Sequence, residues 1–409
     1  MNAVAPVDLD VAIVGGGMVG ASLALALTTT PLRVALIEAA AFDAASQSSF
    51  DGRTSALGNG SRRIFETLGV WADMAPHAAA VREIQVSDAG RPGAARLCAR
   101  EQGIPALGYV LPNRQIGAAL WHALAARPQL NLHVPARVLD ARFDAASVHL
   151  QLDRGAPLAA RVVVAADGAG SLLRARSGIG ALVEDYRQVA LVAHVSTDRP
   201  AGATAYERFT STGPLAVLPL VDGRYTVVWT LAPERAAEVL ALEDGAFIEA
   251  LQRCFGWRIG RLLAVGPRAS YPLRLSRAER LCAPRLVLVG NAAQALHPVA
   301  GQGFNLGLRD AALLAQLLSD AADPGAPAVL ETYQQRRLAD RRGMIGFTDG
   351  LVKLFASEHP VLALARGVGL QIFDLLPGAK QALSRISWGF GGDAPRLMRG
   401  LPLSGGAAP

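Results

Sequence analysis

The segment from Asp10 to Glu38 constrains the fold of this chain more than any other. It consists of an apolar strand, DVAIV, a glycine turn, an apolar helical run, ASLALAL, and a second strand, RVALIE. Gly15, Gly17 and Gly20 form a G-x-G-x-x-G motif between the first strand and the helix. There the first glycine permits a tight turn, the second lets the backbone approach a pyrophosphate, and the third brings helix and strand together. Glu38 ends the second strand, where its carboxylate can accept from a ribose hydroxyl. The segment predicts a dinucleotide-binding βαβ unit rather than an ordinary glycine turn.

The uncharged stretch Val11–Leu32 has the length of a membrane-spanning helix, about 20 residues. Three consecutive glycines and Pro31 nevertheless divide it into a strand and a helix. Mean hydropathy is +0.27, and 51% of the 409 residues are hydrophobic against 18% charged, which is typical of a globular protein with a large core. Asp8 and Asp10 stand where a signal sequence would be basic, so a cytoplasmic protein is expected.

Two further strand ends suit the same kind of ligand. The run RVVVAADGAGSLLR begins as an apolar strand that ends at Asp167 and Gly168. Arg174 follows at a position suited to a second contact with the phosphates. Farther along, the strand Leu286–Val289 ends in a polar turn, and a helix restarts behind Gly301–Gly303. The free N–H groups of a helix start favour negative charge by roughly 0.3–1 kcal/mol when exposed. A reduced flavin carries such a charge, so three distant strand ends are expected to meet one extended ligand.

Cysteine and histidine patterns exclude other classes of site. Cys98, Cys254 and Cys282 are odd in number and widely spaced without a CxxC pair, which argues against a disulfide framework and a zinc site. The seven histidines are scattered, and no HExxH motif occurs. Redox chemistry based on a metal is therefore not expected.

Between the second and third strand ends the pattern changes to short strands. Such strands are predicted over Ala190–Ser196, Ala205–Phe209, Ala216–Leu220 and Tyr225–Leu231, after a linker near Gly178–Glu184. Residues 81–87 are predicted as a strand, and residues 114–126 and 234–262 as helical. This region has no phosphate loop, so we expect an antiparallel sheet that covers the cofactor and lines a substrate pocket. Trp121, Trp229 and Trp257 are predicted core residues.

The C-terminal region carries most of the net charge of +6. From Tyr333 onward, ten Arg or Lys stand against five acids and alternate with apolar residues such as Leu351, Phe355 and Phe373. A basic, amphipathic, mainly helical tail suits peripheral contact with a membrane surface. Packing on the main body or on another subunit explains the pattern equally well. Nucleic-acid binding is not favoured, because the basic residues form no dense run and no recognition motif accompanies them.

In their order along the chain, GGGMVG, AADG and GNAAQALHPVAGQGFNLG resemble the motifs of the single-component FAD-dependent aromatic hydroxylases. Within them the chain is most similar to the ubiquinone-biosynthesis branch, and there to the hydroxylases of 2-polyprenyl-6-methoxyphenol. The resemblance covers nearly the whole chain, through FDGRTSAL, VSDAG, ERFTSTGPLAVLPL, FGWRIG, YPL and YQQRR. It implies an α/β fold in which an FAD-binding Rossmann-like domain, of the glutathione-reductase and p-hydroxybenzoate-hydroxylase type, is interleaved with an antiparallel β-sheet substrate domain. The implied boundaries are 1–80, 112–180 and 275–330 for the FAD-binding domain, 81–111 and 181–274 for the substrate domain, and 331–409 for a helical C-terminal region.

The resemblance also implies roles for individual residues. It places the pyrophosphate at the first glycine turn, the adenosine ribose at Glu38, a backbone contact to adenine at Val138, and the flavin ring beside the helix start. The implied cofactor-binding residues are Gly15, Gly17, Gly20, Glu38, Arg53, Arg114, Val138, Asp167, Gly168, Asn291, Gly301, Gln302, Gly303 and Asn305.

One motif departs from the broad family, which has Gly-Asp-Ala-Ala-His where this chain has Gly290, Asn291, Ala292, Ala293 and Gln294. Asn291 can still bond a ribityl hydroxyl, but it lacks the charge that makes such a bond stronger. FAD affinity below the family norm is therefore expected. The same departure is typical of the 6-methoxyphenol branch.

The chemistry that the resemblance implies is aromatic hydroxylation. NAD(P)H reduces FAD, O2 adds to the flavin, and the resulting hydroperoxide transfers OH to the ring of a polyprenyl phenol. Only one dinucleotide loop is present, so NAD(P)H is expected to bind transiently. Other proteins of the same pathway are expected as partners in a complex, and the inner membrane face is the expected place of any peripheral contact.

The sequence leaves the catalytic residues open. The imidazole of His297 has a pKa near neutrality, which suits the deprotonation of a phenol. The favoured interpretation is nevertheless a histidine that packs in a turn before Pro298. Three competing functions are an NAD-dependent dehydrogenase, a flavin oxidase and a non-catalytic flavoprotein of a biosynthetic complex. The dehydrogenase would not require the Gly290–Gly303 segment. Another ring-hydroxylation step of the same pathway is a fourth alternative.

Overall fold

The glycine-turn segment folds as predicted in the computed structural model, which describes residues 7–41, 52–91, 93–297, 301–356, 378 and 394–403. Strand β1 (Leu9–Val14) leads into α1 (Met18–Leu27) and then into β2 (Val34–Ile37). Every residue of both strands is buried, as expected for a parallel sheet covered on both faces. The uncharged stretch is thus divided into strand and helix. Among the described residues, no helix is long and apolar enough to cross a membrane.

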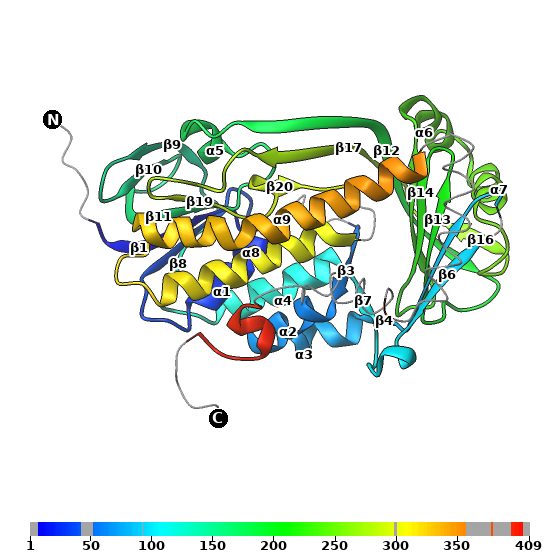
Figure 1. Cartoon of the computed structure of the whole chain (residues 1–409), viewed down its shortest axis with the longest axis horizontal. Helices are drawn as coiled ribbons and strands as arrows, with labels where there is room; N and C mark the ends of the chain where they lie inside the picture. The colour runs from blue at the N-terminus through cyan, green and yellow to red at the C-terminus, as the bar shows by residue number, and fades with distance from the viewer. Residues whose placement is uncertain are drawn as a thin grey trace.

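The first sheet has eight strands, and its central path runs β18–β19–β11–β1–β2–β8. Strand β1 pairs in parallel with β11, and β11 pairs in parallel with β19, so three carboxyl ends lie side by side. Helices α4, α1, α8 and α9 pack against one another in that order beside this sheet (Figure 1). The elements of this part are β8 (Asn131–His133), β9 (Val138–Phe143), β10 (Val148–Leu152), β11 (Leu158–Ala165), β18 (Cys282–Ala283), β19 (Leu286–Leu288), α4 (Asn113–Ala125), α5 (Leu172–Arg176), the short helix η4 (Gly290–Ala292), α8 (Gln302–Ser319) and α9 (Pro327–Ala356).

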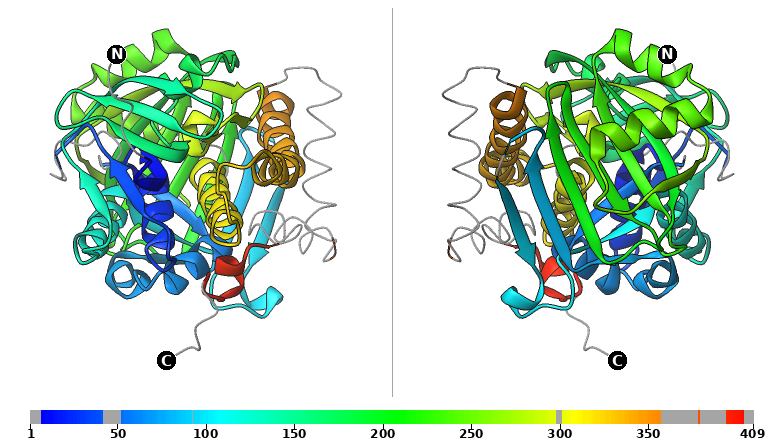
Figure 2. Two further views of the ribbon diagram at one scale, coloured as in Figure 1. Left: turned by 90° about the vertical axis from the view of Figure 1, so that its left-hand side faces the viewer. Right: turned by 90° about the vertical axis from the view of Figure 1, so that its right-hand side faces the viewer.

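The second sheet has nine strands in the order β20–β17–β12–β15–β14–β13–β5–β6, with β16 paired to β12. It is antiparallel as predicted except at β5, which runs parallel to β13. Helices α6 and α7 cover its outer face, and their apolar side chains form a core with the strands (Figures 1 and 2). The elements are β5 (Glu83–Asp88), β6 (Ala94–Cys98), β12 (Ala181–Thr197), β13 (Thr204–Thr210), β14 (Gly213–Pro219), β15 (Tyr225–Leu231), α6 (Pro233–Leu240), α7 (Asp244–Phe255), β16 (Leu262–Val265), β17 (Ala269–Ala278) and β20 (Gln294–Ala295).

A small third sheet, β3–β7–β4, stands between the two large ones. Its Val110 and Val81 pack against Ala205 and Leu220 of the second sheet, which joins the two parts through one apolar cluster. The elements here are β3 (Thr54–Gly58), α2 (Asn59–Thr67), α3 (Trp71–Met74), η2 (Ala75–His77), β4 (Ala79–Val81), η3 (Arg100–Gln102) and β7 (Gly108–Pro112), and the C-terminal turn η6 (Arg396–Arg399) packs on α2.

Four sequence-based expectations need correction. The predicted linker Gly178–Glu184 is strand from Ala181, because β12 pairs with the distant β17 there. The predicted strand over residues 81–87 divides into β4 and β5, which belong to different sheets. Helix α7 stops at Phe255, where Gly256 takes a φ of +90°, and residues 262–265 are strand. Trp257 is 68% exposed rather than buried.

Candidate cofactor site

The first turn is closed so tightly that its glycines are required by the protein itself. Gly15 has a φ of +106°, and a Cβ on Gly20 would lie 1.9 Å from the carbonyl oxygen of Gly15. Gly17 caps α1 without a side-chain hydrogen bond, and no acidic residue stands in the first turn of this helix. The first N–H groups of α1 are therefore left without a side-chain acceptor, as an anion site at a helix start requires.

Glu38 stabilises this turn through hydrogen bonds, and its carboxylate can still accept a hydrogen bond from a ligand. Its Oε2 accepts from the amide N of Gly16 at 2.5 Å and its Oε1 from the amide N of Ala40 at 2.8 Å. Trp121 of α4 donates from Nε1 to the Gly16 carbonyl at 3.1 Å. Each carboxylate oxygen has a further lone pair, which fits a ribose hydroxyl as a donor. The backbone of Glu38 bonds to residues 133 and 136, and Val138 follows at the buried start of β9.

The second turn follows β11 and contains a buried acceptor without a donor. Asp167 Oδ2 accepts from the amide N of Leu173 at 3.4 Å, whereas its buried Oδ1 has no hydrogen-bond partner among the described residues. Burial raises the pKa of Asp167. Gly168 has a φ of +86° with open space around the position of a Cβ. A ligand hydroxyl at Oδ1 would satisfy the acceptor.

The guanidinium of Arg174, which was expected near a phosphate, is bonded to two backbone carbonyls. Its Nη1 donates to the carbonyl of Ala292 at 2.9 Å and its Nη2 to that of Ala169 at 2.7 Å. The guanidinium therefore ties the second turn to the third.

The third turn and the start of α8 form the remaining side of the candidate cofactor site. Gly290 has a φ of +57°, and a Cβ there would lie 3.2 Å from Val19 of α1, so the turn packs directly on the first helix. Asn291 is exposed at this turn. Gly301 adopts a left-handed conformation as the cap of α8, which has no acidic residue in its first turn. Outside the backbone of its own helix, a Cβ on Gly303 would meet no atom of the described residues within 4 Å, which leaves room for a ligand beside the helix start.

Asn305 connects α8 to β3 with its whole hydrogen-bonding capacity. Its Oδ1 accepts from the amide N of Gly58 and from Ser61 Oγ, and its Nδ2 donates to the carbonyls of Ala56 and Gly301. The four distances lie between 2.6 and 2.9 Å. We therefore expect Asn305 to shape the helix start rather than to bond a ligand with its side chain. Gln302 beside it is buried.

The two predicted arginines come from neighbouring strand ends. Pairing of Thr54 with Pro112 brings Arg53 and Arg114 to the same end of the small sheet. The Arg53 guanidinium lies over the ring of Tyr271 in the second sheet, 4.7 Å from its centroid. Arg114 is exposed at the start of α4. Both arginines thus stand between the first and second sheets.

Sequence reasoning missed a buried charged network behind the third turn. Asp310 of α8 accepts from Arg337 Nε at 2.6 Å through Oδ1, and from Gln294 Nε2 at 2.7 Å through Oδ2. Arg337 also bonds Asp340 at 2.6 Å, and Arg309 pairs with Asp340 at 3.1 Å. Burial lowers the pKa of Arg337, but the two aspartates outweigh it and hold that pKa above its usual value. The only sequence signal was a pair of charges, Arg309 and Asp310, inside an apolar helix.

His297 is 1% exposed, and its ring meets that of Tyr186 edge to face at 5.3 Å. Burial lowers the pKa of His297 to about 4, so the imidazole is neutral at physiological pH. These observations favour the packed turn histidine over a catalytic base, and that interpretation stays a prediction.

The titration of His297 makes a prediction for stability. Its pKa rises to ~6.5 on unfolding, so between pH 6.5 and 4 the unfolded chain binds a proton that the folded chain does not. Stability should therefore fall as the pH is lowered through this range, by ~3 kcal/mol from this residue. Urea unfolding at pH 7 and at pH 4 gives the loss in the free energy of unfolding between the two pH values. This loss should be smaller in His297→Gln than in the wild type, by the same ~3 kcal/mol. Equal losses in the two proteins would contradict the prediction.

A second prediction concerns Asn291. Because the side chain is exposed at the third turn, Asn291→Asp can supply a charge to a ribityl hydroxyl without burying it. We expect FAD to bind about fivefold more tightly, or ~1 kcal/mol, as measured by fluorescence titration. Gln335→Glu, which adds the same charge on the exposed side of α9, should leave the affinity unchanged. Equal effects of the two variants would show that general charge, not the turn, is responsible.

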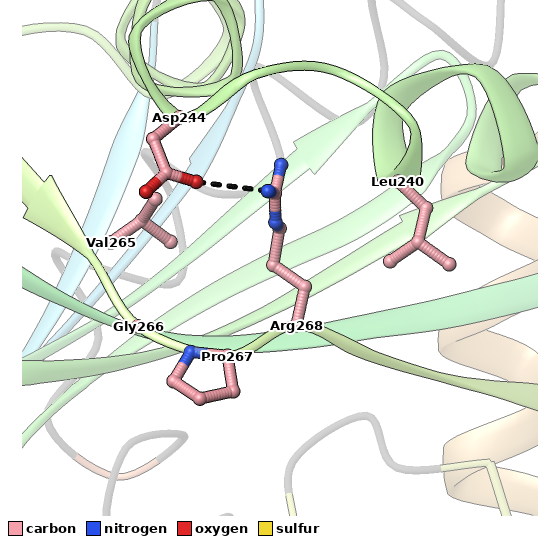
Figure 3. Close-up of a pocket in the computed structure, with 6 residues that line it drawn as sticks. All are labelled: Leu240, Asp244, Val265, Gly266, Pro267 and Arg268. Carbon is pink, nitrogen blue, oxygen red and sulfur yellow. Dashed lines mark hydrogen bonds and ion pairs between the residues drawn. The ribbon is translucent and has the colours of Figure 1, made fainter.

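A surface pocket of about 530 Å³ lies elsewhere, between α6, the start of α7 and the strand ends β16 and β17 (Figure 3). Arg268 and Asp244 bridge it at 2.9 Å. Its lining includes none of the predicted cofactor-binding residues.

The sequence model of the family described as FAD binding domain matches residues 8–348. Ubiquinone hydroxylase UbiL of Rhodospirillum rubrum is 39% identical over 401 residues, which cover 96% of this chain and 93% of that protein. The 3-demethoxyubiquinol 3-hydroxylase of Escherichia coli K12 is 34% identical over 88% of this chain and 93% of its own. Among solved structures, p-nitrophenol 4-monooxygenase PnpA of Pseudomonas putida superposes with a TM-score of 0.77 at 18% identity, covering 93% of this chain and 98% of that one.

Proposed function

Since the chain belongs to the FAD binding domain family, we propose that it hydroxylates the aromatic ring of a polyprenylated phenol in ubiquinone biosynthesis, with 2-polyprenyl-6-methoxyphenol as substrate. The enzyme is an FAD-dependent aromatic monooxygenase with NAD(P)H as the electron donor typical of the family. The substrate class rests on identity to ubiquinone hydroxylases over nearly the full length of the chain. The convergence of the three turns supports the cofactor.

The described residues fit an extended FAD. The α1 start and Gly15, Gly17 and Gly20 would hold the pyrophosphate, and Glu38 would hold the adenosine ribose. The unpartnered Oδ1 of Asp167 would accept from a hydroxyl of the chain between phosphate and ring. When bound, FAD supplies the two-electron chemistry with NAD(P)H and the activation of O2.

The start of α8 would orient the flavin ring and stabilise negative charge on it. Gly301, Gln302 and Gly303 turn their backbone toward the space in front of the helix, where N–H groups favour an anionic ring. Arg53 and Arg114, at one end of the small sheet, and the second sheet would lie on the opposite side of the ring. The protein would therefore position the reacting atoms and limit the access of water to them, while the cofactor would supply the oxygen-transfer chemistry.

We also propose that the chain meets its lipid substrate at the inner membrane face, through the basic C-terminal region or through other proteins of the pathway. Part of that region, residues 357–377, 379–393 and 404–409, lies outside the described residues. Arg337 and Arg341 are buried and bond Asp310 and backbone carbonyls, so they do not contribute to a basic surface. We also propose the domain boundaries that the sequence predicts.

Deletion of the gene in its host tests the substrate. We expect ubiquinone to fall and a prenylated, incompletely hydroxylated phenol to accumulate, as identified by mass spectrometry of the lipid extract. The structure of the accumulating lipid distinguishes 2-polyprenyl-6-methoxyphenol from the substrates of other ring-hydroxylation steps. Normal ubiquinone without an accumulating precursor would contradict the proposal.

A further inference from the structure

Glu207 places a carboxyl on the inner face of the second sheet. On β13, Tyr206 and Arg208 point outward, since Tyr206 meets the ring of Phe255 and Arg208 Nε donates to the Cys254 carbonyl of α7 at 3.1 Å. Side chains alternate along a strand, so Glu207 points to the opposite face. That face is turned away from α6 and α7, toward the first sheet (Figure 1).

The register places Glu207 in an apolar row that crosses the sheet. Glu207 pairs with Val86 on β5 and with Ala216 on β14, and Ala216 pairs in turn with Val228 of β15. Val228 pairs with Val192 of β12, which completes the row. All five residues are half-buried. Their counterparts on the outer face, such as Val217 and Val227, are fully buried under the helices. The inner row is therefore less completely covered than the outer one, and α9 contacts β13 and β14 on this side of the sheet.

Glu207 has no partner of its own among the described residues, since its carboxyl makes neither a hydrogen bond nor an ion pair with them. A carboxyl in apolar surroundings is costly unless it has a role, because burial disfavours its charge. Burial raises the pKa of Glu207 to about 7. Other titratable groups border the same face: Asp88 at the end of β5, His194 on β12, and Asp349 of α9, which accepts from the Tyr186 hydroxyl.

The small third sheet connects the row to the start of α8. Ala205, two residues before Glu207, packs in one cluster with Val110 of β7. Strand β7 pairs with β3, whose Ala56 and Gly58 are bonded by Asn305 in the first turns of α8. The apolar row and its carboxyl thus face the region where the flavin ring is proposed to lie.

We propose that Glu207 is a catalytic residue that binds the phenolic hydroxyl of the substrate and accepts its proton, while Val86 and Ala216 on the two neighbouring strands flank the ring. This rests on the proposed function, because it requires a phenol as substrate. The O–H proton passes to a carboxylate oxygen of Glu207, and the electron pair of the broken O–H bond stays on the phenolic oxygen. Its release into the ring makes the ring carbon a better nucleophile. The carboxylic acid returns the proton to the oxygen of the product, so Glu207 is regenerated.

Kinetics of the FAD-loaded full chain test the role. Glu207→Gln keeps the size of the side chain but cannot accept a proton, so kcat should fall by ~100-fold or more. In the wild type kcat/KM should decline below pH 7, where the carboxyl becomes protonated, and this decline should be absent in Glu207→Gln. Glu207→Asp should keep the decline with a smaller loss of rate. Glu184→Gln, which removes an exposed charge from β12, should behave as the wild type. Wild-type rate and pH profile in Glu207→Gln would overturn the proposal.

A binding measurement separates this proposal from the proposed function. A short-chain prenylphenol and its O-methyl ether are titrated into the FAD-loaded protein, with the flavin absorbance as signal. A hydrogen bond to a charged group predicts a preference of the wild type for the phenol of ~10–100-fold above pH 7, lost below it and lost in Glu207→Gln. Phenol and ether bound equally by the wild type at every pH would overturn the role of Glu207. If the preference is found but no phenol is hydroxylated, the proposed function fails and the site remains.

Discussion

Gly20→Ala should yield a protein that purifies without bound FAD. A Cβ at this position would lie 1.9 Å from the carbonyl oxygen of Gly15, and backbone atoms cannot retreat as the end of a flexible side chain can. The first turn must open, which separates α1 from β1 and removes the approach to the pyrophosphate. We expect a loss of roughly 3 kcal/mol in the free energy of unfolding of the apoprotein. Absorbance of the purified protein and urea unfolding measure the two effects.

Gly303→Ala is the matched variant that separates protein from cofactor. Among the described residues, a Cβ there meets no atom within 4 Å outside the backbone of α8, so the apoprotein should be as stable as the wild type. The added methyl group faces the proposed place of the flavin ring, and FAD affinity should fall about tenfold, or ~1.4 kcal/mol. Gly245→Ala, in the first turn of α7 with equally open surroundings, should change neither quantity by more than about 1 kcal/mol. Unchanged FAD affinity in Gly303→Ala would place the ring elsewhere.

Asp310→Asn should destabilise the protein by about 3–5 kcal/mol, because it removes the charge of the more deeply buried of the two carboxylates that pair with the buried Arg337. Asp310 also accepts from Gln294 at 2.7 Å and from the amide N of Gly290 at 3.4 Å, so the third turn should loosen and FAD should bind more weakly. Urea unfolding of the apoprotein and FAD titration measure the two consequences separately.

The control is Asp320→Asn on the end of the same helix. Asp320 pairs with Arg396 at 3.0 Å at the surface, where both side chains are partly exposed, and such pairs contribute ~0–1 kcal/mol. A double-mutant cycle with Arg337→Met isolates the coupling between Asp310 and Arg337. If Asp310→Asn costs no more than Asp320→Asn, the buried network does not hold the third turn.

Local signals carried most of what the sequence could predict. The first βαβ unit follows from a strand pattern, a glycine spacing and an acidic strand end, all within Asp10–Glu38. Helix α4 and the strands β13 and β15 were predicted to within one residue, because periodicity and turn residues mark their ends. Their positions required no knowledge of distant partners.

Long-range pairing set the features that the sequence could not reveal. Residues 181–184 follow the turn glycines Gly178 and Gly180 and were predicted as part of a linker, yet they are strand because β17 pairs with them from nearly a hundred residues away. The division of β4 from β5 depends likewise on which sheet each strand joins. For the site, the motif identified Asn305 as a neighbour of the cofactor but could not show that its side chain is fully bonded to β3 and to Gly301.

The central claim is that this chain transfers an oxygen atom from O2 to a polyprenyl phenol. The most direct test supplies the purified, FAD-loaded protein with NAD(P)H, a short-chain 2-polyprenyl-6-methoxyphenol and O2 enriched in the heavy isotope, and analyses the product by mass spectrometry. We predict a ring-hydroxylated product that carries one heavy oxygen atom, with NAD(P)H consumed in equal amount. Consumption of NAD(P)H with hydrogen peroxide and unaltered phenol as the only products would contradict the claim.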